Sequence, residues 1–107
     1  MQLNLNDYSD ETKSFAISIV NFLKDKLGQI PETFKYSLDI LLTNYQVWSE
    51  ARMDVLHRGA LIEVNGEVKK NPSYKILNDA QIFLNNQLKS WSLDLKSLKQ
   101  LDSFTGN

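Results

Sequence analysis

Basic side chains gather around a single Asn-Gly pair in the second half of the chain. Arg58 precedes that pair, and Lys69 and Lys70 follow it. Lysine and arginine neutralise phosphate groups, so such a cluster is typical of a polyanion-binding surface. The interleaved Glu63 and Glu67 favour an alternative, a solvated hairpin of mixed charge. The phosphate-facing set that the spacing predicts is His57, Arg58, Lys69, Lys70 and Lys75.

No catalytic motif accompanies these cations. The chain has no glycine-rich phosphate loop, no GxSxG nucleophile elbow and no carboxylate pair with a histidine partner. His57 is the only histidine, and beside Arg58 it resembles a partner for a helix C-terminal dipole more than a general base. Cysteine is absent, which excludes disulfides, thiolate metal ligands and cysteine nucleophiles. We therefore expect no enzyme activity, no cofactor and no metal site.

Composition limits what the cationic cluster can do alone. At 107 residues the chain is predicted to be one domain, 1–107, because it is too short for two independent cores. Its net charge is −1, whereas a monomer that binds nucleic acid tightly is usually basic. Nucleic-acid binding would therefore depend on local clustering or on repetition in an oligomer. No apolar run is long enough to span a membrane, and the polar, acidic N-terminus does not resemble a secretory signal, so we expect a soluble intracellular protein without a membrane partner.

Three helical segments must position the cluster. Residues 1–8 lack a helical period and are predicted to form a loose arm. Ser9 is a suitable N-cap and Gly28 a suitable terminator for a first helix over 9–28. Pro31 restarts the chain, and apolar residues in steps of three and four predict a long second helix over 31–58.

The Asn-Gly pair is the strongest short-range signal for a tight hairpin, which we place at 60–70. An Asn-Pro step then favours the start of a third helix over 72–90. A short amphipathic helix over 93–101 and a mobile tail over 102–107 complete the prediction. The fold class is thus mainly α, with a long antiparallel helix pair joined by a short β-hairpin.

The apolar stripes of the helices are broader than one partner helix needs, which indicates contact with other copies of the chain. A head-to-tail contact that closes produces a ring-forming oligomer. Arg52 occupies a position in the second helix where an apolar residue is expected. Either its stem packs while its head reaches a carboxylate, or it forms an intersubunit ion pair. The predicted oligomer interface comprises Phe15, Phe22, Tyr45, Trp48 and Arg52.

A set of residues around the hairpin forms a pattern: Tyr45, Gly59, Gly66, Lys69, Asn71, Pro72 and Ala80. This pattern resembles the small terminase subunits of tailed bacteriophages, in the branch where a glycine hairpin precedes an Asn-Pro or His-Pro step. The similarity covers residues 34–101. That family usually has a glycine-leucine, a proline and an arginine after the third helix, whereas this chain keeps Leu93 and Ser97 but lacks the proline and the arginine.

The resemblance implies a non-enzymatic component of the viral genome-packaging motor. Its partners would be viral double-stranded DNA, further copies of itself in a homo-oligomeric ring, and the terminase large subunit, which holds the ATPase and nuclease activities. Its location would be the cytoplasm of the infected bacterial host. The main alternative is a phage head-completion or adaptor protein that does not bind DNA. A small helix-turn-helix transcription factor fits less well. That motif joins its two helices by a turn of three or four residues, whereas here the longer hairpin predicted at 60–70 joins the second and third helices.

Overall fold

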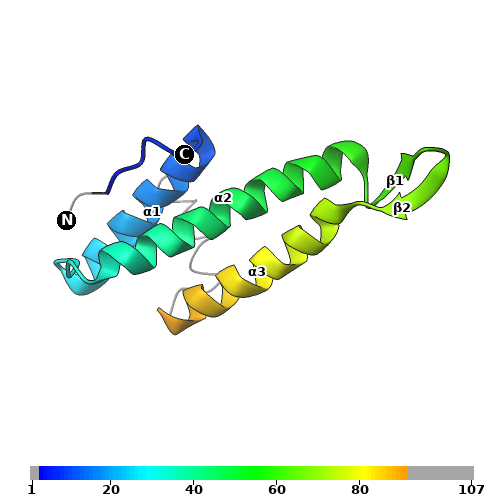
Figure 1. The fold of residues 1–107 in the computed structure, drawn as a ribbon. Coiled ribbons are helices and arrows are strands. Elements are labelled where there is room, and N and C mark those ends of the chain that lie inside the picture. The colour runs from blue at the N-terminus through cyan, green and yellow to red at the C-terminus, as the bar shows by residue number, and fades with distance from the viewer. Residues whose placement is uncertain (1–2, 92–107) are drawn as a thin grey trace.

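The computed structural model describes residues 3–91, which form three helices and one β-hairpin. In Figure 1, two long helices lie side by side and antiparallel, the hairpin projects beyond their shared end, and the first helix lies along the other end of the pair. The mainly helical class with a two-stranded antiparallel hairpin is therefore confirmed. The elements are α1 (Asp10–Leu27), α2 (Phe34–Arg58), β1 (Leu61–Val64), β2 (Glu67–Lys70) and α3 (Pro72–Ser90).

Local signals set the ends of α1 and the start of α2. The Ser9 hydroxyl accepts the backbone N–H of Thr12 at 3.2 Å, and Gly28 ends α1 with φ of 76°. The second helix begins at Phe34, three residues later than predicted. Residues 31–33 instead form a turn in which the Pro31 carbonyl accepts the Phe34 N–H at 3.0 Å.

The segment 3–8 contains no helix, but it is attached to α2. The Tyr8 hydroxyl donates to a carboxylate oxygen of Asp39 at 2.5 Å, and the Ser9 N–H donates to Gln46 at 3.0 Å. Burial and the hydrogen bond to Asp39 both raise the pKa of Tyr8, so its hydroxyl stays protonated and can donate. The loose arm of the prediction is thus held in place over these residues.

The apolar core lies where the three helices meet. The side chains of Leu38 and Leu41 on α2 and Ile19 on α1 are fully buried. Fully burying an aliphatic side chain of this size stabilises a fold by about 1.5–3 kcal/mol. The central cluster consists of Ile19, Leu23, Ile30, Leu38, Leu41, Leu84 and Leu88. The predicted short helix over 93–101 and the predicted tail over 102–107 lie outside the described residues.

Candidate nucleic-acid interface

The hairpin is a short ribbon with a tight turn. Asn65 and Gly66 have φ of 53° and 81°, the left-handed backbone that a type I′ turn requires. The register pairs Ile62 with Lys69 and Leu61 with Lys70. Because successive strand residues point to opposite faces, the two lysines lie on opposite faces of the ribbon.

The base of the hairpin is held by one buried polar residue, Asn71, whose exposed fraction is 1%. Its side-chain oxygen accepts the Ser73 N–H at 2.9 Å and so caps α3, while its side-chain nitrogen donates to the Gly59 carbonyl at 2.9 Å. Its backbone N–H donates to the Ala60 carbonyl at 2.8 Å. Asn71 therefore joins the end of α2, the hairpin and the start of α3. We call this arrangement the Asn71 joint.

Arg58 belongs to the same joint. Its guanidinium donates to both carboxylate oxygens of Asp54, at 2.6 and 2.7 Å, and to the side-chain oxygen of Asn71 at 3.3 Å. The hydrogen bond from Arg58 is the main reason that the pKa of Asp54 lies well below its usual range, and a bond from Ser73 adds to it. The residue predicted to face phosphate thus stabilises the joint. Asp54 was missed in the sequence, although its spacing of four residues from Arg58 is the helical ion-pair signal.

The other predicted cations are exposed, and two of them have acidic neighbours. Lys75 donates to Asp79 at 2.8 Å, which raises the pKa of the lysine, and the Lys69 ammonium lies 3.8 Å from a Glu67 carboxylate oxygen. Within residues 3–91, neither Lys70 nor His57 forms an ion pair. The hairpin end thus presents mixed charge, and a phosphate would have to compete with carboxylates for Lys69 and Lys75.

The aromatic residues predicted to form an oligomer interface pack within the chain. Phe15 of α1 stacks on Tyr45 of α2 with ring centroids 4.0 Å apart, and Trp48 lies 5.7 Å from Tyr45. Arg52 places its guanidinium 5.9 Å from the centre of the Trp48 ring, a cation–π contact. The sequence predicted a carboxylate partner for Arg52, either within the chain or on another copy. Phe22 packs against the core cluster. The four aromatic side chains are partly buried, Arg52 is exposed, and the stack of Phe15 on Tyr45 joins α1 to α2.

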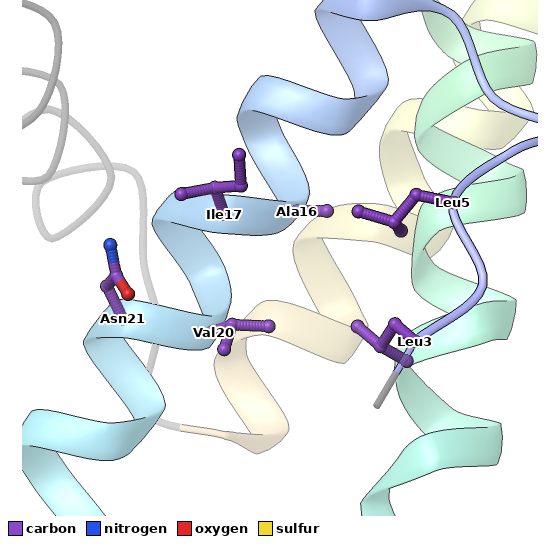
Figure 2. A pocket seen from close by; sticks show the side chains of 6 residues that line it. All are labelled: Leu3, Leu5, Ala16, Ile17, Val20 and Asn21. Atoms are coloured by element: carbon purple, nitrogen blue, oxygen red, sulfur yellow. The ribbon is translucent and has the colours of Figure 1, made fainter. Parts of the chain in front are cut away.

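Two small apolar cavities open beside α1. The first, which we call the aromatic groove, has a volume of about 220 Å³ and lies among all three helices. The second, of about 210 Å³, lies between the N-terminal segment and α1. Figure 2 shows Leu3 and Leu5 from that segment facing Ala16 and Val20 of α1. No acidic, basic or histidine side chain lines either cavity, so both suit an apolar side chain better than a charged ligand. The residues of the aromatic groove are Phe15, Tyr45, Trp48, Gln81, Leu84, Asn85 and Leu88.

Comparison of the chain with protein-family models, with curated proteins and with solved structures finds no significant match. Over residues 3–91, no helix is both long and apolar enough to cross a membrane, and no group of three or more potential metal ligands is found. The resemblance to small terminase subunits therefore depends on the motif residues alone.

Large apolar side chains that sequence reasoning did not assign to an interface are exposed on α2. Tyr36 is 77% exposed, and Ile40 and Val47 follow it at steps of four and seven residues. This spacing places the three side chains on one side of the helix. The same spacing is present in the sequence. It was not assigned to an interface, because the aromatic residues on the core-facing side of the helix form a stronger pattern.

Proposed function

We propose that this protein is a phage terminase small subunit, a non-enzymatic and oligomeric protein that binds viral double-stranded DNA in the host cytoplasm and presents it to the large ATPase and nuclease subunit. The observation that carries the proposal is that the family-like residues serve one structural unit. Gly59 ends α2, Gly66 completes the hairpin turn, and Asn71 with Pro72 starts α3. These residues of the resemblance therefore lie in one helix–hairpin–helix unit of this chain.

The projecting hairpin supports a DNA contact. Lys69 and Lys70 are exposed on its two faces, so one of them can reach a phosphate whichever face approaches the duplex. The balanced local charge makes binding by one copy weak. A ring of copies gains affinity because every contact after the first forms at high effective concentration.

The exposed apolar side chains of α2 support self-association. Tyr36, Ile40 and Val47 form an apolar stripe that water solvates poorly. If this stripe contacts a different surface on the next copy, the contact is head-to-tail and can close into a ring.

The decisive experiment is a fluorescence-anisotropy titration of duplex DNA with the doubly substituted Lys69→Ala, Lys70→Ala protein over a range of salt concentrations. Each lost phosphate contact should weaken binding and reduce the slope of log affinity against log salt by about 0.9. The matched control removes the same charge from the far end of α1, as Lys24→Ala with Lys26→Ala, and should change the slope less. An unchanged slope in the hairpin variant, with its oligomeric state intact, would refute the assignment of these lysines.

The second candidate function is that of a phage head-completion or adaptor protein that does not bind DNA. It is favoured by the ion pairs of Arg58 with Asp54 and of Lys75 with Asp79, which occupy two of the predicted cations. The same titration separates the two functions, because the adaptor predicts no salt-dependent DNA binding by the unsubstituted protein.

A further inference from the structure

The β-hairpin has two open edges. Over residues 3–91 the sheet consists of β1 and β2 alone, so each strand has a neighbour on one side only. An open strand edge presents unpaired N–H and C=O groups and can pair with a strand of another chain. All four residues of β2 are exposed, and the apolar side chain of Val68 is 71% exposed. The outer edge of β2 is therefore accessible to a further strand.

The backbone groups of Val68 point to this open edge. In an antiparallel pair, the N–H and C=O groups of successive residues point alternately toward the partner strand and away from it. The Asn71 N–H points toward the other strand, since it donates to the Ala60 carbonyl at 2.8 Å. Counting back from Asn71 places the backbone groups of Lys70 and Val68 on the outer side. Two copies of β2 that lie antiparallel can therefore exchange two hydrogen bonds at Val68.

The side chains on either side of Val68 are complementary in such a pair. When two β2 strands pair antiparallel about Val68, Glu67 of each copy lies opposite Lys69 of the other copy. Opposite charges in directly opposed positions stabilise a sheet. An edge lysine usually discourages pairing, but here each lysine meets a carboxylate. The same arrangement of β1 about Glu63 would place two carboxylates opposite each other, which is destabilising, so β2 is the favoured edge.

We propose that β2 pairs with β2 of a second copy of this chain, antiparallel and centred on Val68, to form a four-stranded sheet. This contact uses the same surface on both copies, unlike the head-to-tail contact of a ring. It lies on the hairpin, leaves the apolar stripe of α2 free and does not rest on the proposed function. Four residues from each copy form a smaller contact than a stable interface needs, so the association is weak and is best captured covalently.

Cysteine cross-linking tests the register, because the chain has no cysteine of its own. In the proposed pair, the two Val68 Cα atoms are about 5.5 Å apart, which a disulfide can bridge. Under mild oxidation without DNA, Val68→Cys should form a product of twice the chain mass about tenfold faster than Lys70→Cys. Lys70 lies on the same face of β2, but its two Cα atoms would be about 14 Å apart. Equal rates for the two variants would overturn the proposal and leave the DNA titration unaffected.

Charge exchange tests the side-chain pairing in the Val68→Cys background. Glu67→Lys alone, or Lys69→Glu alone, places like charges opposite each other and should slow the cross-linking. An equimolar mixture of these two variants restores opposite charges at both positions and should recover the rate. The same mixture in the Lys70→Cys background controls for general attraction between the chains and should show no such gain. If mixing gives no gain, or an equal gain in both backgrounds, the register is wrong.

Amide hydrogen exchange provides a readout on the unsubstituted protein. The Val68 N–H points to the outer edge of β2, so its exchange should slow as the protein concentration rises. The Glu63 N–H points to the outer edge of β1, because Glu63 is paired with Val68, and it is the internal control that should not respond. Exchange at Val68 that is independent of concentration, over the range in which the Val68→Cys variant cross-links, would contradict the pairing.

Discussion

The two ends of the α2–α3 pair are stabilised by different forces. Toward the start of α2, aliphatic side chains such as Leu38 and Leu41 are fully removed from water. At the hairpin end, nearly every strand residue is exposed, and hydrogen bonds to the buried Asn71 connect the elements. An isolated two-stranded hairpin is at best marginally stable in water. The orientation of the hairpin therefore depends on a few polar contacts, whereas the helical body depends on many apolar ones.

This difference predicts that the surface residues of the hairpin can be substituted without unfolding the protein. Few apolar contacts at the hairpin end contribute to the free energy of unfolding, so its surface residues are open to change for binding. Interior residues of the helical body tolerate substitution less well. The interior is closely packed, so a change in side-chain volume there lowers the free energy of unfolding.

The largest effect is expected in the body. Leu41→Ala should lower the free energy of unfolding by about 2–5 kcal/mol, because it leaves a cavity at a fully buried position. Met53→Ala, on the same helix at a position with 58% exposure, is the control and should cost much less. Urea denaturation followed by circular dichroism measures both. Equal losses for the two variants would contradict the placement of the core.

A smaller effect is expected at the hairpin end. Asn71→Ala removes the cap of α3 and the bond to the Gly59 carbonyl, and should lower the free energy of unfolding by about 1–3 kcal/mol. Amide hydrogen exchange should accelerate in residues 61–70 more than in α1, because the joint opens locally. Asn86→Ala, at an exposed position of α3, should leave both measurements unchanged. Uniform acceleration across the molecule would argue against a separate polar joint.

The ion pair of the Asn71 joint should make stability depend on pH. The pKa of Asp54 is lowered in the folded state, so its contribution is fully present above the unfolded pKa of 3.8 and is lost as the pH falls toward the folded value. The unsubstituted protein should therefore unfold at a higher urea concentration than the Asp54→Asn variant. This difference between the two urea midpoints should be larger at pH 7 than at pH 3. An advantage of the same size at both pH values would show that the Asp54 charge does not contribute.

The smallest effect is expected from the exposed pair on α3. Lys75→Ala removes the contact with Asp79 at a site where water and salt screen the charges. The urea midpoint should not change measurably. A clear loss of stability would mean that exposed charges at the hairpin end contribute to folding in addition to the Asn71 joint.

The sequence by itself determined the ends of most elements, because these depend on neighbouring residues. Ser9 caps α1, the Asn65–Gly66 pair makes the turn, and Asn71 with Pro72 starts α3. The start of α2 was placed too early, since Pro31 permits either a first helical turn or the observed loop and only packing selects between them. The positions of the cations were also visible in the sequence.

The tertiary structure decided what those side chains contact. In the Asn71 joint, Arg58 donates to Asp54 and to Asn71. The positive charge of Arg58 alone would have suited a phosphate partner equally well. Phe15 stacks on Tyr45 across two helices of the same chain, a contact that the residues next to either position do not determine. The physical reason is the same in both cases. Local conformation depends on the few residues next to a position, whereas the partner of a side chain depends on how separate helices come together in space.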